Sequence, residues 1–179
     1  CINASNSSNA IIEIYGLPEP NLSASADSIC EGESVTFYAE NGLNYDWTIN
    51  SGSSVIQTGV VDSFSTNSLI QGDTVFVSLT DINSCLGSDF YSIDVSPLPI
   101  LNLGNDTTIC DGFSLLIDGT TPFVTYLWGS GENTSSITVS DSGTYELTVT
   151  NNYDCSATDS IDVNLFPNPV VDLGQDDTI

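Results

Sequence analysis

The chain repeats itself, and its cysteines keep their place in the repeat. Residues 102–109 (NLGNDTTI) return 70 positions later as residues 172–179 (DLGQDDTI). The first copy continues directly into Cys110, and the second stops one residue before the equivalent cysteine is expected. Self-similarity at a fixed period is the sequence signature of a repeat architecture. We therefore expect this chain to be a section of a longer tandem array.

Two further features mark where each repeat begins and ends. Residues 30–35 (CEGESV) correspond to residues 110–115 (CDGFSL), and each repeat closes on a second cysteine, Cys85 or Cys155. A Pro-x-Pro motif begins twelve residues after each closing cysteine, and another such motif occurs near the N-terminus. These marks predict the tail of a preceding repeat at 1–18, complete domains at 19–98 and 99–168, and the first strand of a following repeat at 169–179.

The charge of the chain excludes several classes of partner. It has 24 Asp and Glu residues and no Lys, Arg or His, for a formal net charge of −24. Such a chain repels nucleic acid and anionic lipid headgroups, so neither is an expected partner. No apolar run approaches the length of a membrane span, so we expect no direct membrane insertion. The chain is 40% hydrophobic and its apolar residues alternate, which argues for a folded protein and against an acidic disordered tail.

The cysteines are expected to act as covalent staples. Cys1 would have its partner upstream, and the other four are expected to pair as Cys30 with Cys85 and Cys110 with Cys155. Four cysteines allow three pairings, and only this one respects the repeat. Regular disulfides indicate an oxidising location, which is extracellular or at the cell surface. A zinc site is not expected, because the chain has no histidine and no Cys-x-x-Cys pair.

Alternating apolar residues predict an all-β fold. Period-two alternation runs through both complete repeats, and helical periodicity is not convincing anywhere. Short strands separated by Gly, Asn and Asp turns are typical of a β-sandwich. The residues expected to point inward are Val35, Phe37, Ala39, Tyr45, Trp47, Ile49, Val75, Val77 and Leu79 in the first repeat, and Leu115, Ile117, Tyr126, Trp128, Ile137, Val139, Tyr145, Leu147 and Val149 in the second. Both tryptophans are therefore predicted to pack in the core and not to bind sugars.

One segment resembles immunoglobulin-like domains. Residues 141–149 (DSGTYELTV) are similar to the penultimate strand of that fold, with Tyr145 at the tyrosine corner and Trp128 as the central tryptophan. The residue two positions after the tyrosine is Leu147 where antibody domains have cysteine. The resemblance implies tandem immunoglobulin-like sandwiches in an elongated array, with one disulfide per domain at a place different from that in antibodies.

A narrower resemblance concerns residues 104–110 (GNDTTIC) and 126–163 (YLWGSGENTSSITVSDSGTYELTVTNNYDCSATDSIDV). They are similar to the tandem immunoglobulin-like or PKD-like repeats of giant surface proteins in the phylum Bacteroidota. The likeness is looser in the first repeat, where Val75 replaces the corner tyrosine. It implies a secreted or cell-surface adhesin that is exported by the type IX secretion system.

The same resemblance implies a modification. Bacteroidota glycosylate the hydroxyl group of Asp-(Ser/Thr) followed by a small or aliphatic residue. The matching hydroxyls are Ser28, Thr74, Thr107, Ser160 and Thr178. Three of them, Ser28, Thr107 and Thr178, lie two or three positions before the observed or expected first cysteine of a repeat, which favours the glycosylation hypothesis. The alternative is that these Asp and Thr residues shape turns and fit edge strands.

No cofactor is expected, and calcium is the one ion considered. Hard oxygen ligands suit Ca²⁺, and carboxylates without counter-charges could bind it and stiffen the domain junctions. The candidates are Asp106, Asp172, Asp176 and Asp177 in the junction strands, with Asp81 and Asn83 before Cys85. No EF-hand or other defined loop is present, and a diffuse cation atmosphere is the alternative.

Catalysis is not expected. The chain has no His, Lys or Arg, so carboxylates are the groups left for acid–base chemistry. A glycosidase-like carboxyl pair is conceivable, for instance Glu31 with Glu33, but these residues flank a turn beside a cysteine and no cleft is indicated. We interpret these acids as solvated turn residues.

The sequence as a whole predicts a non-enzymatic stalk. Stapled sandwiches joined by Pro-x-Pro linkers would give reach and mechanical stability to a long extracellular adhesin or appendage. Its partners would be neighbouring repeats of the same chain, and lateral copies if a filament forms; the sequence identifies no tip ligand. The alternatives are a module that itself binds a carbohydrate or a surface, and a spacer in a multidomain secreted enzyme.

Overall fold

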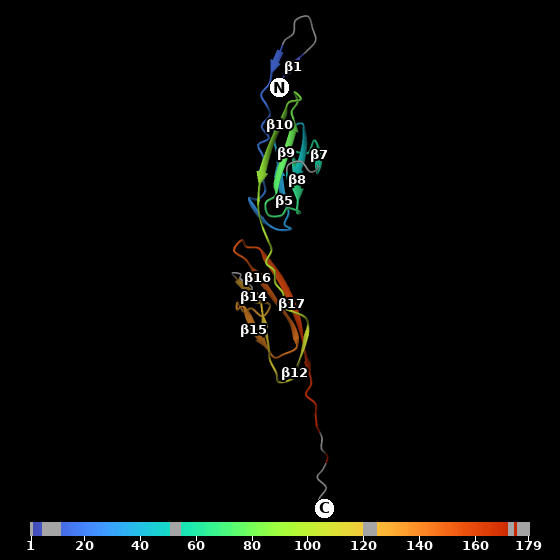
Figure 1. Ribbon diagram of the computed structural model, residues 1–179, viewed down its shortest axis with the longest axis vertical. Helices are drawn as coiled ribbons and strands as arrows, with labels where there is room; N and C mark the ends of the chain where they lie inside the picture. Colours follow the sequence, from blue (N-terminus) through green and yellow to red (C-terminus); the bar gives the residue numbers. More distant parts are fainter. Residues whose placement is uncertain (1, 5–11, 51–54, 120–124, 172–173, 175–179) are drawn as a thin grey trace, which may run out of the picture. The chain divides into compact units, whose positions relative to one another are not determined.

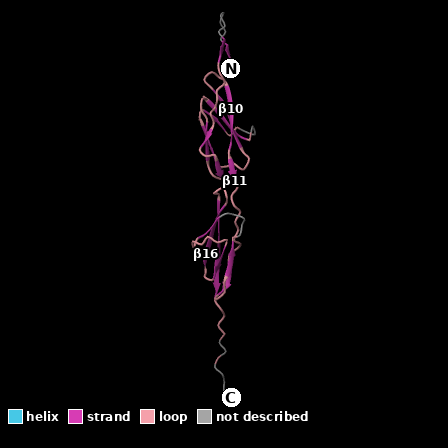
Figure 2. Ribbon diagram, turned by 90° about the vertical axis from the view of Figure 1, so that its left-hand side faces the viewer, coloured by secondary structure: helices cyan, strands magenta, loops and turns pink. Residues whose placement is uncertain are grey.

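The structure of the chain is a computed structural model, and it describes residues 2–4, 12–50, 55–119, 125–171 and 174. Every regular element in those residues is a strand (Figure 2), which confirms the predicted all-β class. In chain order the strands are β1 (Ile2–Ala4), β2 (Ile12–Ile14), β3 (Ser23–Ala24), β4 (Ser28–Cys30), β5 (Val35–Tyr38), β6 (Asn44–Ile49), β7 (Gln57–Gly59), β8 (Ser63–Thr66), β9 (Thr74–Thr80), β10 (Leu86–Ser92), β11 (Asp94–Ser96), β12 (Thr107–Cys110), β13 (Leu115–Asp118), β14 (Thr125–Trp128), β15 (Ser136–Val139), β16 (Gly143–Thr150) and β17 (Ser156–Phe166).

The chain divides into two compact units, Cys1–Pro97 and Leu98–Ile179. The division lies within the second Pro-x-Pro motif, where proline restricts the backbone and removes hydrogen-bond donors. The repeat limits expected from the sequence, at 18, 98 and 168, stay predictions.

The first unit is a sandwich of two antiparallel layers. One sheet has the order β10-β9-β6-β7 and the other the order β3-β5-β8 (Figure 1). A short strand, β4, pairs in parallel with β11, which follows β10. Strands β5 and β8 thus lie in one sheet, whereas β6, β9 and β10 lie in the other. This division is that of an immunoglobulin-like sandwich.

The second unit repeats this arrangement. Its larger sheet has the order β12-β17-β16-β14, and β13 pairs with β15 to form the other layer. Strand β12 again pairs in parallel with the last strand, from Thr107 opposite Val163 to Cys110 opposite Phe166. In Figure 1, β17 runs the length of the unit as one continuous strand. The predicted immunoglobulin-like fold is therefore seen in both units.

Each unit has its own apolar core around one tryptophan. Trp47 is 0% exposed and Trp128 is 1% exposed, which confirms their predicted packing. In the first unit Phe64 stacks between Phe37 and Trp47, with ring centroids 6.4 and 5.9 Å away. The residues predicted to point inward are buried or half-buried against these two cores. Alternation along a pleated strand explains this success, since successive side chains point to opposite faces.

The corner of the second unit has the predicted tyrosine contact. The hydroxyl of Tyr145 donates a hydrogen bond to the carbonyl oxygen of Asp141 at 2.9 Å. Leu147, at the position of the antibody cysteine, is fully buried. In the first unit the corresponding Val75 is also fully buried, so an apolar side chain fills the place of the tyrosine ring.

Candidate functional site

Two kinds of turn occur in both units, and every one of these turns contains a cysteine. We call the turns at residues 30–33 and 110–113 the strand-end turns. We call the turns at residues 81–85 and 151–155 the hairpin turns. These turns lie at the ends of the paired strands in both units, and we take them as the candidate functional site.

The first strand-end turn closes β4. The amide of Glu33 donates to the carbonyl oxygen of Cys30 at 3.0 Å, and the amide of Cys30 donates to the Glu33 carboxylate at 2.9 Å. Gly32 has a φ of 86°, a conformation that glycine adopts without steric cost. The amide of Glu31 donates to Ser96 at 2.9 Å, so the turn lies against the end of β11.

The second strand-end turn has the same geometry. The amide of Phe113 donates to Cys110 at 3.1 Å, and Gly112 has a φ of 84°. The amide of Asp111 donates to Phe166 at 2.9 Å, at the end of β17. The Cys-acid-Gly pattern found in the sequence therefore encodes one turn, used twice.

The hairpin turn of the first unit joins β9 to β10. The Oδ1 atom of Asp81 accepts hydrogen bonds from the amides of Asn83 and Cys85, both at 2.8 Å. Ser84 has a φ of 62°, which is uncommon for a residue with a Cβ. A side-chain oxygen that caps its own turn in this way explains the tight return of the chain.

The hairpin turn of the second unit joins β16 to β17. Here Asn151 replaces the aspartate, and its Oδ1 atom accepts from Tyr153 at 2.9 Å and from Cys155 at 3.1 Å. Asp154 has a φ of 61°. Cys85 and Cys155 are each 1% exposed, so the two hairpin cysteines are alike in burial as well as in backbone.

The predicted disulfide pairing is wrong. Cys30, Cys85 and Cys155 are disulfide-bonded, whereas Cys110 is a free, exposed thiol, so Cys110 does not pair with Cys155. Cys1 lies outside the described residues.

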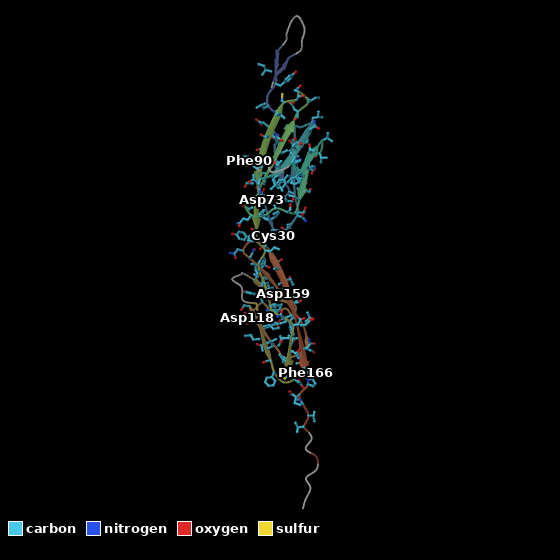
Figure 3. All side chains as sticks on the ribbon, turned by 45° about the vertical axis from the view of Figure 1, so that its right-hand side comes forward. Cys30, Asp73, Phe90, Asp118, Asp159 and Phe166 are labelled. Carbon is cyan, nitrogen blue, oxygen red and sulfur yellow. The ribbon has the colours of Figure 1, made fainter. Side chains whose placement is uncertain are left out.

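The reason is the length of the last strand of each sandwich. In the second unit Cys110 lies opposite Phe166, the last residue of β17, which is labelled in Figure 3. Cys155 lies eleven residues before Phe166 in the chain. At about 3.3 Å a residue this is roughly 35 Å, whereas bridged cysteines have Cα atoms about 4.4–6.8 Å apart. Each hairpin cysteine therefore lies at the opposite end of its own sandwich from the strand-end cysteine.

The same separation holds in the first unit. Cys30 lies opposite Ser96, and Cys85 lies eleven residues earlier, before β10 and β11. Two short strands with one residue between them cover roughly 30–35 Å. The expected pair Cys30–Cys85 is excluded by this register.

The four motif aspartates that the structure describes, Asp27, Asp73, Asp106 and Asp159, make hydrogen bonds within the fold. Asp27 accepts from the Tyr91 hydroxyl at 2.6 Å, and Asp106 accepts from the Asp162 amide at 3.0 Å. Asp159 accepts from the Leu103 amide at 2.7 Å. These hydrogen bonds give the aspartates a structural role, which the sequence offers as the alternative to glycosylation.

The hydroxyls of those motifs differ in accessibility. Ser28 and Ser160 are exposed, whereas Thr74 and Thr107 are half-buried, and Thr178 lies outside the described residues. Asp73, which precedes Thr74, is only 7% exposed and accepts from Asn50 at 2.6 Å and from the Ile70 amide at 2.9 Å. Glycosylation at these five positions stays a prediction.

The calcium candidates are not gathered into a cluster where they are described. No group of three or more acidic, cysteine or histidine residues that could hold a metal occurs in the described part of the chain. Asp81 uses its Oδ1 atom to cap the hairpin turn. Asp172, Asp176 and Asp177 lie outside the described residues.

One tyrosine has a clearly shifted pKa. The hydrogen bond that Tyr91 donates to Asp27 raises the pKa of the phenol above its ordinary value, and burial and the negative charge of Asp27 act in the same direction. This bond links β10 to the residue just before β4. It therefore helps to hold the first strand-end turn against the last strand of the sandwich.

A pair of aromatic residues lies on the outer face of the first unit. Phe76 and Phe90 are cross-strand neighbours on β9 and β10, with ring centroids 5.8 Å apart, and Phe90 is 60% exposed. The position equivalent to Phe90 in the second unit is Ser160. The sequence reading placed most aromatic residues inward and did not single out this pair.

The described residues contain no helix that has the length and apolar character needed to cross a membrane. A comparison of the sequence with protein-family models and with curated proteins finds no match.

Solved structures with a similar arrangement are immunoglobulin-like or fibronectin-like. The DIP-gamma IG1+IG2 structure is 13% identical over 82% of this chain and 98% of that chain, with a TM-score of 0.39. Murine CEACAM1b is 15% identical over 83% of this chain and 100% of that chain, with a TM-score of 0.38. The fibronectin(III)-like modules of Clostridium thermocellum CbhA are 11% identical over 82% and 94%, with a TM-score of 0.37. No function follows from similarities of this size.

Proposed function

We propose that this chain is a load-bearing stalk segment of a long extracellular adhesin or appendage. The observation that carries the proposal is a parallel pairing of an early strand with the last strand in both units, β4 with β11 and β12 with β17. A chain built from repeated units of this kind gains reach with copy number and needs no catalytic group.

Parallel pairing matters because of the direction of load. Tension applied at the two ends of the second unit pulls its first strand, β12, backward and its last strand, β17, forward. The hydrogen bonds between two parallel strands are then sheared together, whereas strands pulled from one shared end are peeled one bond at a time. In the second unit the bonds of Asp159 to Leu103 and of Asp162 to Asp106 extend the sheared region beyond β12.

Three disulfide-bonded cysteines support an oxidising, extracellular location. Export by the type IX system of a Bacteroidota cell is what the sequence resemblance implies. The net charge of −24 would keep neighbouring stalks soluble and apart, and it would limit lateral assembly to conditions in which salt screens the repulsion.

Glycosylation would add to this surface. Ser28 and Ser160 are the exposed hydroxyls among the described motif positions, so we expect them to be modified first. Intact mass of the protein purified from its native cell, compared with the protein made in a host without this modification, measures the sugar. Equal masses would show that the chain is not glycosylated, and they would not contradict the proposed load-bearing role.

Single-molecule pulling tests the mechanical role. Anchors at Leu98 and Pro169 shear β12 against β17, whereas anchors at Leu98 and Asn152 peel the same strand from the hairpin end. Both experiments use a reductant so that hydrogen bonds alone carry the load. We expect the second unit to open at a clearly higher force in the first geometry. Equal forces would contradict a load-bearing design.

Carbohydrate binding is the second candidate, and the exposed Phe76–Phe90 pair is the observation that favours it. Aromatic faces stack on sugar rings, and this pair lies on an open sheet face. A glycan array probed with the chain and with Phe90→Ala separates the two functions. Binding that is lost in Phe90→Ala would favour the binding module; no binding leaves the stalk as the better account.

A further inference from the structure

We infer that the outer edge of β10, in the first unit, binds an extended basic peptide of another protein by strand addition. Strand β10 is the last strand at one side of its sheet, whereas its counterpart β17 is flanked by β12. An uncovered edge presents backbone N–H and C=O groups with which an incoming strand can pair. The second unit has a strand on the equivalent edge, so the two edges can be compared residue by residue.

The comparison centres on Asp89 of β10 and Asp159 of β17, which are 70 positions apart, the period of the repeat. The Oδ1 atom of Asp159 accepts from the amide of its neighbour Ser160 at 2.9 Å, and its Oδ2 atom accepts from the Leu103 amide at 2.7 Å. The Oδ1 atom of Asp89 accepts from the amide of its neighbour Phe90 at 2.8 Å in the same way. No described residue donates to its Oδ2 atom. Asp89 therefore keeps available the acceptor that fastens a neighbouring segment in the second unit.

The edge of β10 is uncovered because the preceding segment takes a different path in the first unit. Residues 23–24 form β3, which pairs with β5 in the opposite sheet. Strand β4 joins the last strand only from Asp94 onward, beyond the end of β10. Pro18 approaches β10 at one end, where a Cβ at Gly87 would lie 2.1 Å from its carbonyl oxygen. Residues 88–92 thus have no strand beside them, and Asp89 is exposed whereas Asp159 is half-buried.

The backbone of β10 directs donors to this uncovered side. The Phe90 amide is bonded to the Asp89 side chain, which places it on the side away from β9. Donors alternate between the two sides of an antiparallel strand, so the Ser88 and Ser92 amides point the same way. The equivalent of Ser92 is Asp162, whose amide is bonded at 3.0 Å to the residue just before β12. An incoming strand would therefore meet backbone donors as well as the Asp89 carboxylate.

Charge decides which kind of strand fits this edge. The net charge is −24 and the chain has no cation, so a second copy or any other acidic segment would be repelled. On the outer face of the sheet the side chain next to the edge is Phe90, which is labelled in Figure 3 and is 60% exposed. Successive side chains of a strand point to opposite faces. The expected occupant therefore alternates basic residues on the side of Asp89 with apolar residues beside Phe90.

A synthetic peptide tests the inference on the whole chain. The probe is a capped heptapeptide of alternating lysine and valine, and its affinity is measured by titration calorimetry in about 150 mM NaCl, which screens distant charges. We expect binding to the wild type and an affinity lower by roughly tenfold or more for Asp89→Ala, because a hydrogen bond to a charged acceptor is lost. Glu146→Ala removes an exposed carboxylate from the second unit and should bind as the wild type does. Equal affinities for the two variants, or no binding to the wild type, would overturn the inference.

Two altered peptides separate strand addition from charge attraction. Proline in place of the central valine keeps the charge but removes a backbone donor, so binding should be lost. Glutamate in place of every lysine should also abolish binding. The parent peptide should slow hydrogen exchange at the Ser88 and Ser92 amides, and unchanged exchange there would contradict pairing at this edge. A proline peptide that binds as tightly as the parent would rule out strand addition. These results are independent of the stalk proposal, because no load is applied to the chain.

Discussion

At the scale of single residues, the carboxylates of this chain act as acceptors for neutral donors. The chain has no basic side chain, so Asp73 accepts from Asn50 and from a backbone amide, and Asp27 accepts from Tyr91. Hydrogen bonds to an ionised acceptor are stronger than neutral ones. These hydrogen bonds connect loops to neighbouring strands, although the same acids repel one another across the surface.

Asp159 is the clearest test of this use. Asp159→Ala removes the hydrogen-bond acceptor of the Leu103 amide. Leu103 is only 8% exposed, so the amide would be left without a hydrogen-bond partner at a buried position. We expect a loss of about 1–3 kcal/mol in the free energy of unfolding, measured by urea denaturation. Asp89→Ala is the control, because Asp89 binds the amide of its own neighbour Phe90 and should change stability little.

Tyr91 predicts how stability depends on alkaline pH. The pKa of the Tyr91 phenol is raised in the folded state. The stabilisation that this residue gives the folded state is therefore complete below the unfolded pKa of about 10, and it is lost as the pH rises through the folded pKa. Tyr91→Phe should therefore lose less stability between pH 8 and pH 11 than the wild type. Tyr38→Phe, at an exposed tyrosine, should follow the wild type in urea titrations at both pH values. Parallel curves for all three proteins would contradict the role of Tyr91.

At the scale of elements, the strand-end turns and the hairpin turns have the same backbone geometry in both units. The two strand-end turns share one glycine conformation and one set of backbone contacts, although their fourth residues are Glu33 and Phe113. The hairpin turns share one cap, although the capping residue is Asp81 in one and Asn151 in the other. The repeat therefore preserves backbone geometry more closely than side-chain identity.

Gly112→Ala tests the cost of this geometry. A Cβ at Gly112 meets no atom within 4 Å, so the penalty comes from the backbone angle alone. We expect a loss of about 1–2 kcal/mol in stability. Gly143→Ala, in the same unit and without a positive φ, should be nearly neutral in the same melt. A neutral Gly112→Ala would mean that the turn relaxes.

At the scale of the whole molecule, charge is the dominant feature. A net charge of −24 with no positive side chain makes the compact state repel itself.

Salt dependence tests the electrostatic part. Raising NaCl from 10 to 150 mM shortens the Debye length from about 30 Å to about 8 Å, so we expect the melting temperature to rise. CaCl₂ at the same ionic strength should give a similar rise if the cations form a diffuse atmosphere. A much larger rise with CaCl₂ would indicate a specific calcium site, and a fall with NaCl would contradict the self-repulsion.

The sequence by itself determined the all-β class, the inward-facing residues and the turns. These follow from local periodicity: alternation places Trp47 and Trp128 in the cores, and glycine at Gly32 and Gly112 permits the turn conformation. Only the tertiary structure decided that Cys30 and Cys85 lie too far apart to bond. The repeat suggested a bond between Cys30 and Cys85, but the last strand of the sandwich carries the hairpin cysteine to the far end, and that distance depends on strand length and register, which the period of a repeat does not record.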